Sequence, residues 1–183
     1  MSWVFLSGPM GAGKSTVGPR VAEALGLPYL DLDAHIAARV GRPAGAFLAA
    51  EGEDAFRRLE DELLARELGA APKVMALGGG TVVQKALRRR LLEAGTLVTL
   101  MAPLPVLLAR VGEGEGRPLL AGDAASRLAR LLEVRADAYA EAHGVVEAAR
   151  DPETVAAAEV ALERDAHVDV THGNRASRVE VGA

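Results

Sequence analysis

The chain of 183 residues contains no cysteine, which excludes disulfide bonds, thiolate metal ligands and a cysteine nucleophile. Aromatic residues make up only 3% of the sequence, so a core has to be built mainly from leucine, valine and alanine. Basic residues are not in excess, and the formal net charge is -4. This balance gives no support to a nucleic-acid partner. A solvated helix face explains the one basic cluster, Arg88–Arg90, more simply.

Long apolar runs are also missing. The longest uncharged stretch, Gly95–Ala109, contains two prolines and is too short to span a bilayer. The N-terminal apolar run is too short for a signal peptide and ends in a glycine loop. The four histidines show no metal-ligand spacing. We therefore expect a soluble, cytoplasmic protein without a membrane partner.

Half of the residues are hydrophobic. Short β-like runs alternate with helical segments along the chain. The β-like runs are Trp3–Ser7, Tyr29–Asp31, Lys73–Leu77, Thr96–Leu100 and Val145–Glu147. Apolar residues recur at helical spacing between some of them, as in Val17, Val21 and Leu25 or Val83, Leu87 and Leu91. This alternation predicts an α/β fold in which helices cover both faces of a parallel sheet. Ligands of such sheets bind beyond the carboxyl ends of the strands.

The clearest motif is Gly8-Pro-Met-Gly-Ala-Gly13-Lys14-Ser15-Thr16, which matches the Walker A pattern between a strand and a helix. Glycines let backbone N–H groups turn toward phosphate oxygens, and the start of the helix adds its positive dipole end. In this pattern Lys14 reaches the β- and γ-phosphates of the nucleotide and the Ser15 hydroxyl coordinates Mg²⁺. The loop residues predicted to hold the nucleotide are Gly11, Ala12, Gly13, Lys14, Ser15 and Thr16.

The Walker A pattern predicts nucleotide binding but leaves the phosphoryl acceptor open. The base-reading pattern Asn-Lys-x-Asp of GTPases is absent. Asp31 and Asp33 follow next, two residues apart at the end of a strand, so both carboxylates are expected on one face. One could hold Mg²⁺ through water and the other could accept a proton from an attacking hydroxyl. The alternative is that Asp33 only caps the following helix.

Two arginines lie beside apolar stripes of predicted helices. Arg57 borders the stripe Phe56, Leu59 and Leu63, with Glu60 and Asp61 within a helical turn. A carboxylate neighbour would hold its guanidinium ready for an anionic substrate, whereas an ordinary surface ion pair is the simpler interpretation. Arg135 shares a helix face with Leu128, Leu131, Leu132 and Tyr139. An arginine on such a face needs a partner, for which a carboxylate ligand is one explanation and snorkelling to the edge the other.

Two glycine-rich segments complete the pattern. Gly78, Gly79 and Gly80 follow the third strand, where they expose backbone N–H groups and admit a ligand closely. The loop "GEGEGRPLLAGD" is long enough to suggest a lid, and it carries Arg117. Closure of such a lid over the γ-phosphate would neutralise charge in the transition state, although a disordered connector has the same composition.

Taken together, "GPMGAGKST", "DLD", "FRRLE", "LGGG", "RPLLAG" and the later Arg135 resemble shikimate kinases in their order and spacing, over roughly residues 3 to 160. The resemblance implies a P-loop NTPase-type, three-layer α/β/α fold with a five-stranded parallel sheet and a mobile lid. It also implies phosphorylation of the 3-hydroxyl of shikimate by ATP, in aromatic amino-acid synthesis. The nearest alternatives are another small-molecule kinase, such as a gluconate kinase, and a nucleotide-dependent switch without transfer activity.

The same resemblance implies a role for each matching residue. Lys14, Asp33 and Arg117 would be catalytic, with Asp33 as the base, and Ser15 and Asp31 would hold Mg²⁺. Arg57 and Arg135 would grip the shikimate carboxylate while Gly79 and Gly80 line the ring. Arg110 and Arg150 would pack the adenine. These expectations name the shikimate-binding set as Asp33, Arg57, Gly79, Gly80 and Arg135.

The end of the chain differs in composition from the rest. We expect a kinase domain over residues 1–164, acting as a monomer, and a separate segment over 165–183. The ending "GNRASRVEVGA" resembles the opening strands of 3-dehydroquinate synthase, which implies a fused polypeptide. The alternative is a disordered tail.

Overall fold

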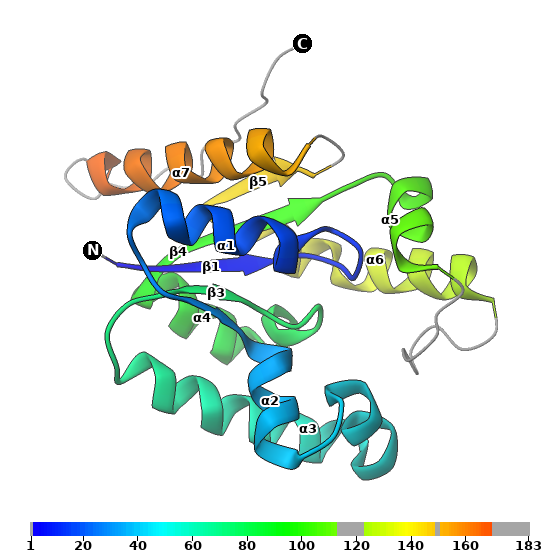
Figure 1. Cartoon of the computed structure of the whole chain (residues 1–183). Coiled ribbons are helices and arrows are strands. Elements are labelled where there is room, and N and C mark those ends of the chain that lie inside the picture. Colours follow the sequence, from blue (N-terminus) through cyan, green and yellow to red (C-terminus); the bar gives the residue numbers. More distant parts are fainter. Residues whose placement is uncertain (1, 113–122, 149–150, 170–183) are drawn as a thin grey trace.

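The computed structural model describes residues 2–112, 123–148 and 151–169. Five parallel strands form one sheet in the order β2-β3-β1-β4-β5 (Figure 1). The strands are β1 (Trp3–Ser7), β2 (Tyr29–Asp31), β3 (Val74–Ala76), β4 (Gly95–Met101) and β5 (Gly144–Glu147). The predicted α/β class and parallel sheet are therefore confirmed, and each predicted strand lies within a residue or so of an observed one.

Helices cover both faces of this sheet (Figure 1). They are α1 (Lys14–Leu25), α2 (Leu32–Val40), α3 (Ala44–Leu68), α4 (Lys85–Ala94), α5 (Leu104–Val111), α6 (Ala124–Ala140) and α7 (Pro152–Asp169), with a short 3-10 helix η1 (Thr81–Val83). Backbone pairing is parallel throughout, as connections through helices require. None of these helices in the described part of the chain has the length and apolar character needed to cross a membrane.

Residues of β1 alternate between two hydrophobic cores. Val4 and Leu6 pack with α1 and α7, whereas Trp3 and Phe5 pack with residues of α3, α4 and α6. Successive side chains of a strand point to opposite faces, so one short strand anchors both layers of helices. Because all four residues are almost fully buried, the loop that follows β1 starts from a rigid base.

Helix α1 begins directly after the glycine loop and runs unbroken through Pro19. Gly13, the residue before it, has a left-handed backbone with φ of 96°. Pro19 lies in the second turn, where the loss of one intrahelical N–H is tolerated. Helix α7 begins at Pro152 and continues to Asp169.

The prediction that Arg88–Arg90 form a solvated face is wrong for Arg88. Its side chain is buried and donates hydrogen bonds to the carbonyl of Val82 at 2.6 Å and to Glu141 at 2.8 Å. These partners compensate the charge, so Arg88 can occupy the inner face of α4. Arg89 and Arg90 do face solvent, and each pairs with an acidic side chain.

The loop with Arg117, the residue Arg150 and the segment after residue 169 lie outside the described residues. The lid, the adenine contact of Arg150 and the tail therefore stay predictions. The division of the chain at residue 164 also stays a prediction.

Candidate active site

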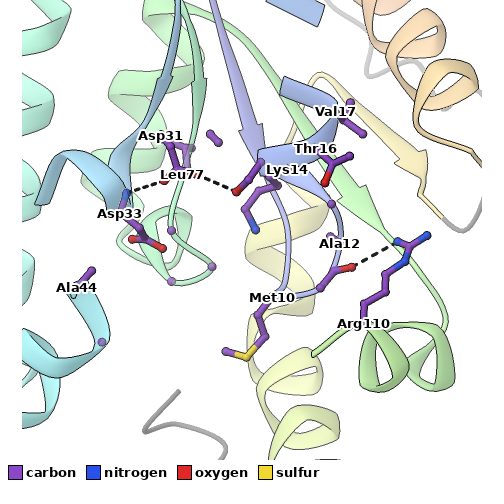
Figure 2. A pocket seen from close by; sticks show the side chains of 18 of the residues that line it. Met10, Ala12, Lys14, Thr16, Val17, Asp31, Asp33, Ala44, Leu77 and Arg110 are labelled. Atoms are coloured by element: carbon purple, nitrogen blue, oxygen red, sulfur yellow. Dashed lines mark hydrogen bonds between the residues drawn. The ribbon is translucent and has the colours of Figure 1, made fainter. Parts of the chain in front are cut away.

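A cavity of about 810 Å³ opens at the carboxyl ends of the strands (Figure 2). It brings together residues that are far apart in the sequence, from the loop after β1 to helices α5 and α6. The predicted site residues that line it are Gly11, Ala12, Gly13, Lys14, Ser15, Thr16, Asp31, Asp33, Arg57, Gly79, Gly80, Arg110 and Arg135. A single hollow thus joins the phosphate loop to the arginines predicted to hold an acceptor.

Lys14 lies at the start of α1 and its side chain folds back over the loop. The Nζ atom donates hydrogen bonds to the carbonyl oxygens of Gly8 and Pro9, at 2.7 and 3.0 Å. Gly13, the residue before α1, has no side chain that could cap the N-terminus of the helix. The loop therefore presents a lysine charge and the positive end of a helix dipole to the cavity, which together suit a phosphate chain.

Ser15 and Asp31 form a pair of oxygen donors beside the loop. The Ser15 hydroxyl donates to Asp31 Oδ2 at 2.8 Å, while Oδ1 of Asp31 accepts the N–H groups of Asp33 and Ala34. The carboxylate is thereby fixed as the cap of α2, with one oxygen turned toward Ser15. A hydroxyl and a carboxylate oxygen are hard ligands of the kind that Mg²⁺ takes.

No group of three or more acidic or histidine side chains that could hold a metal occurs within the described residues. A Mg²⁺ ion at Ser15 and Asp31 would therefore take its other ligands from water and from phosphate oxygens. Mg²⁺ in nucleotide sites commonly binds one or two protein ligands plus phosphates. The residues present fit this mode of binding.

Asp33 was expected on the same strand face as Asp31, and this is wrong. The strand ends at Asp31 and α2 begins at Leu32, so Asp33 lies in the first turn of the helix. The alternative that Asp33 caps α2 is also wrong, because Asp31 is the cap. Both carboxylates nevertheless reach the same cavity (Figure 2).

The surroundings of Asp33 have opposite effects on the pKa of its carboxyl group. Burial raises the pKa of Asp33 above its ordinary value, and the neighbouring carboxylates of Asp31 and Glu60 add to this. Lys14 and Arg57 act in the opposite direction but do not cancel the rise. A carboxylate with a raised pKa accepts a proton more readily, which suits a general base.

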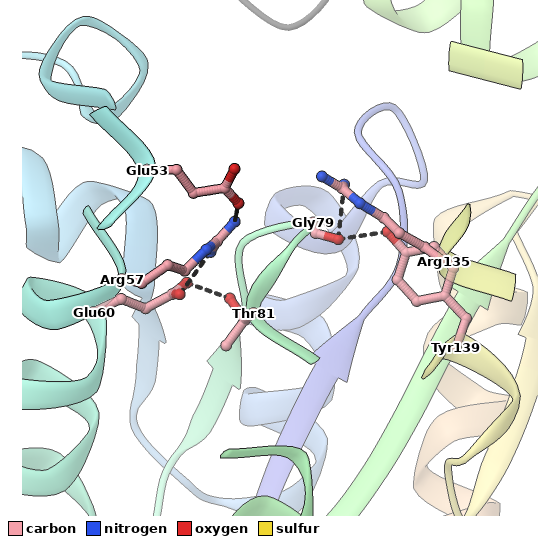
Figure 3. Close-up of polar contacts among 7 residues, drawn as sticks. All are labelled: Glu53, Arg57, Glu60, Gly79, Thr81, Arg135 and Tyr139. Carbon is pink, nitrogen blue, oxygen red and sulfur yellow. Dashed lines mark hydrogen bonds and ion pairs between the residues drawn. The ribbon is translucent and has the colours of Figure 1, made fainter. Parts of the chain in front are cut away.

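Arg57 is held by two carboxylates of its own helix. Its Nη1 donates to Glu60 at 2.6 Å and its Nη2 lies 3.3 Å from Glu53 (Figure 3). Glu60 is fully buried and also accepts the Thr81 hydroxyl at 2.5 Å. Burial acts to lower the pKa of Arg57, but the two carboxylates outweigh it and raise the pKa above the ordinary value. The expected carboxylate neighbour is confirmed as Glu60.

Asp61, the other residue considered as a partner for Arg57, faces away from the cavity. It forms an exposed ion pair with Arg90 of α4 at 2.5 Å. The sequence spacing alone did not distinguish the two acidic neighbours. Thr81 follows the glycine triplet, so its contact with Glu60 ties α3 to the loop after β3.

Arg135 approaches the cavity from α6. Only 9% of its surface is exposed, and its Nη1 donates to the carbonyl of Gly79 at 3.0 Å. The Tyr139 hydroxyl donates to the same carbonyl at 2.6 Å (Figure 3). Among the described residues no carboxylate forms an ion pair with Arg135. A buried guanidinium without a counter-charge favours an anionic ligand.

Tyr139 is a site residue that sequence reasoning assigned only to the apolar stripe. It lies one helical turn after Arg135, and this spacing was the available signal. Burial raises the pKa of Tyr139, while Arg135 acts to lower it. The phenol therefore stays protonated and donates to the Gly79 carbonyl, which positions the glycine loop.

Each residue of the glycine triplet lies against a different charged side chain. A Cβ added at Gly80 would lie 2.3 Å from Nη2 of Arg57, which excludes any side chain there without displacement. At Gly79 the nearest atom would be Nη1 of Arg135, and at Gly78 it would be Oδ1 of Asp33. The absence of side chains lets three charged groups approach one short loop.

Arg110 lies on the opposite side of the phosphate loop. Its Nη1 donates to the carbonyl of Ala148 at 2.7 Å and contacts that of Gly11 at 3.4 Å (Figure 2). These contacts hold a flat cation at the rim of the cavity, beyond the phosphate loop and away from Arg57 and Arg135.

A family model described as shikimate kinase matches residues 10–164. The chain belongs to the shikimate kinase family. Among its relatives, the shikimate kinase of Salinibacter ruber is 44% identical over 83% of this chain and 79% of its own length. That of Salinispora arenicola is 42% identical over 86% of this chain and 95% of its own length.

Solved structures agree with this family. The shikimate kinase from Acinetobacter baumannii in complex with shikimate is 31% identical, with a TM-score of 0.82 and 96% of each chain covered. The shikimate kinase from Aquifex aeolicus is 28% identical, with a TM-score of 0.75 over 93% of this chain and 99% of its own. A gluconokinase from Sinorhizobium meliloti, 22% identical with a TM-score of 0.64, shares the fold of the shikimate kinase family.

Proposed function

We propose that this chain transfers the γ-phosphoryl group of ATP to the 3-hydroxyl of shikimate, giving shikimate 3-phosphate and ADP. The observation that carries the proposal is the cavity in which a phosphate loop faces two arginines and a carboxylate with a raised pKa. Membership of the shikimate kinase family identifies the acceptor. The carboxylate of shikimate supplies the anion that the Arg135 guanidinium lacks in the described residues.

On the donor side, the N–H groups of the loop and the Lys14 charge bind the β- and γ-phosphates. Lys14 leaves the carbonyls of Gly8 and Pro9 to do so, and both lie in the same loop. Ser15 and Asp31 would hold Mg²⁺, which neutralises phosphate charge when it is bound. Arg110 would pack against the adenine at the rim.

On the acceptor side, Arg57 and Arg135 bind the shikimate carboxylate and Gly79 and Gly80 line the ring. Asp33 binds the acceptor hydroxyl and takes its proton. The hydroxyl oxygen forms a bond to the γ-phosphorus while the bond to the bridging oxygen of ADP breaks. Catalysis is then mainly positioning and charge neutralisation, as phosphoryl transfer requires.

Arg117 would contact the phosphates and Arg150 the adenine. We also propose that the enzyme acts as a monomer. We place the enzyme in the cytoplasm, where ATP is available. A fused second enzyme after the kinase domain is tested by the intact mass of the native gene product.

The direct test of the reaction is ADP release with and without shikimate, together with ³¹P NMR of the product. We expect shikimate to stimulate ADP release and a phosphate monoester of shikimate to appear. The same assay with gluconate in place of shikimate tests the alternative that the chain is a gluconate kinase. ADP release that no acceptor stimulates would overturn the proposal, and stimulation by gluconate alone would assign a different acceptor.

The role of Asp33 is tested by Asp33→Asn. The amide cannot accept the proton, so we expect turnover to fall by about 100-fold or more with ATP binding nearly unchanged. In the unaltered enzyme, kcat/KM should fall at acid pH as Asp33 is protonated, with a midpoint above the ordinary carboxylate value because its pKa is raised. Exposed Asp54→Asn on α3 is the control. If Asp33→Asn and the control turn over at the same rate, Asp33 is not the general base.

A further inference from the structure

Tyr29 lies on β2, and its ring packs against α1 at Gly18. A Cβ at Gly18 would lie 2.3 Å from Cε2 and 3.1 Å from Cζ of Tyr29. The glycine therefore makes room for the aromatic ring on the surface of the helix. Gly18 follows Ser15 by three residues, so both lie on the same face of α1. Tyr29 and Asp31 are two residues apart on β2, so their side chains leave the strand on the same face.

The Tyr29 hydroxyl is buried and has no hydrogen-bond partner in the part of the chain that the structure describes. The Tyr29 side chain therefore lies on the side of the Ser15–Asp31 pair, and its hydroxyl forms no hydrogen bond with either of them. An unsatisfied buried hydroxyl costs free energy, so a native structure that keeps one calls for an explanation.

We propose that the Tyr29 hydroxyl is an outer-sphere positioning group of the cation site, hydrogen-bonded to a water ligand of the Mg²⁺ held by Ser15 and Asp31. This inference rests on the proposed function, because it requires a cation at that pair. Groups that bond to the ligands of a metal orient them and raise the affinity of the site. Mg²⁺ keeps several waters when it binds beside phosphates, so such a ligand is expected there.

The competing explanation is that the ring alone matters, as packing over Gly18. The two explanations differ for Tyr29→Phe, which keeps the ring and removes only the hydroxyl. If only packing matters, the variant folds as well or better and binds the cation equally. If the hydroxyl orients a water ligand, the variant folds normally but binds the cation less tightly.

The test is Mn²⁺ binding to the ADP-loaded enzyme by electron paramagnetic resonance, with Mg²⁺ measured by competition. For Tyr29→Phe we expect the affinity for both ions to fall by about 10-fold, which is the smallest loss typical of mutating a group that bonds to a metal ligand. Binding of ADP without a divalent ion should be unchanged. Tyr139→Phe is the matched control, since it removes the hydroxyl on the acceptor side and should leave cation affinity unaltered.

A spectroscopic readout needs no change at Tyr29. The chain has two tyrosines, so in Tyr139→Phe only Tyr29 contributes tyrosine absorption. Addition of Mg²⁺ to the ADP complex should then give a tyrosine difference spectrum, and Tyr29→Phe in the same background should abolish it. Unchanged Mn²⁺ affinity in Tyr29→Phe, or no difference spectrum, would overturn the inference. Shikimate-stimulated ADP release is measured separately, so failure here leaves the proposed function standing.

Discussion

Arg57 and Arg135 reach one cavity from opposite elements, α3 and α6, but their charges are balanced differently (Figure 3). Arg57 is paired with buried Glu60 and with Glu53, which the solvent reaches. Arg135 is more deeply buried and bonds to the Gly79 carbonyl, with no ion pair among the described residues. The first guanidinium is thus neutralised by the fold, whereas the second is left for a ligand.

This difference separates stability from binding. Removal of Arg57 leaves Glu60 as a buried carboxylate whose remaining partner is the Thr81 hydroxyl. Removal of Arg135 leaves no buried charge behind, and the Tyr139 hydroxyl still donates to the Gly79 carbonyl. We therefore expect Arg57 to stabilise the folded protein and Arg135 to contribute more to the attraction of the substrate carboxylate.

Arg57→Ala should have the largest effect on stability. Breaking a buried ion pair by removing one partner costs about 3–5 kcal/mol, so the free energy of unfolding in urea should fall by that order. Arg90→Ala is the control, because its pair with Asp61 is exposed and worth at most about 1 kcal/mol. If the two variants lose the same stability, the buried pair is not the structural element inferred here.

Arg135→Ala should have the larger effect on the acceptor. We expect binding of shikimate to weaken by about 2–4 kcal/mol, measured as acceptor KM and by calorimetry, with little loss of stability. Exposed Arg130→Ala, on the same helix, is the control and should leave KM unchanged. A KM of Arg135→Ala equal to that of the control would contradict the role of Arg135.

Glu159 on α7 extends the comparison to a buried carboxyl group that no described side chain or backbone group binds. Both carboxylate oxygens lack a hydrogen-bond partner among the described residues, and burial raises the pKa of Glu159 to about 8. The folded protein therefore holds a proton that the unfolded chain releases above its ordinary carboxylate pKa. Stability should be highest below that value and fall as pH rises toward about 8.

The expected slope of the unfolding free energy from Glu159 does not exceed about 1.4 kcal/mol per pH unit. Glu159→Gln cannot lose a proton and should remove this slope. Urea denaturation of both proteins between pH 5 and 8 measures the difference, with those limits taken roughly from the two pKa values. Parallel stability curves for the two proteins would show that the carboxyl is not the titrating group.

The donor side of the cavity was predictable because its signals are local. Strand, glycine loop, Lys14 and helix follow one another within a few residues, and loop geometry is set by that order. Helical spacing likewise placed Arg135 on the apolar face of its helix, but it left open whether the guanidinium is buried or extends to the edge.

Contacts between distant segments could not be predicted in the same way. Arg88 is buried because it pairs with Glu141, which is 53 residues away in sequence. The packing of Tyr29 on Gly18 likewise depends on the sheet order.

The predicted position of Asp33 was wrong for a local reason. A spacing of two residues does not reveal whether the second residue lies on a strand or in the first turn of a helix.

The central claim is that the substrate carboxylate lies between Arg57 and Arg135 while the phosphate loop holds ATP. The most direct measurement compares kcat/KM for shikimate and for its uncharged carboxamide, in the unaltered enzyme and in Arg135→Ala. The unaltered enzyme should prefer the acid by roughly 30-fold or more, which corresponds to about 2 kcal/mol, and Arg135→Ala should lose most of that preference. Equal use of both acceptors by the unaltered enzyme, or an unchanged preference in Arg135→Ala, would contradict the account.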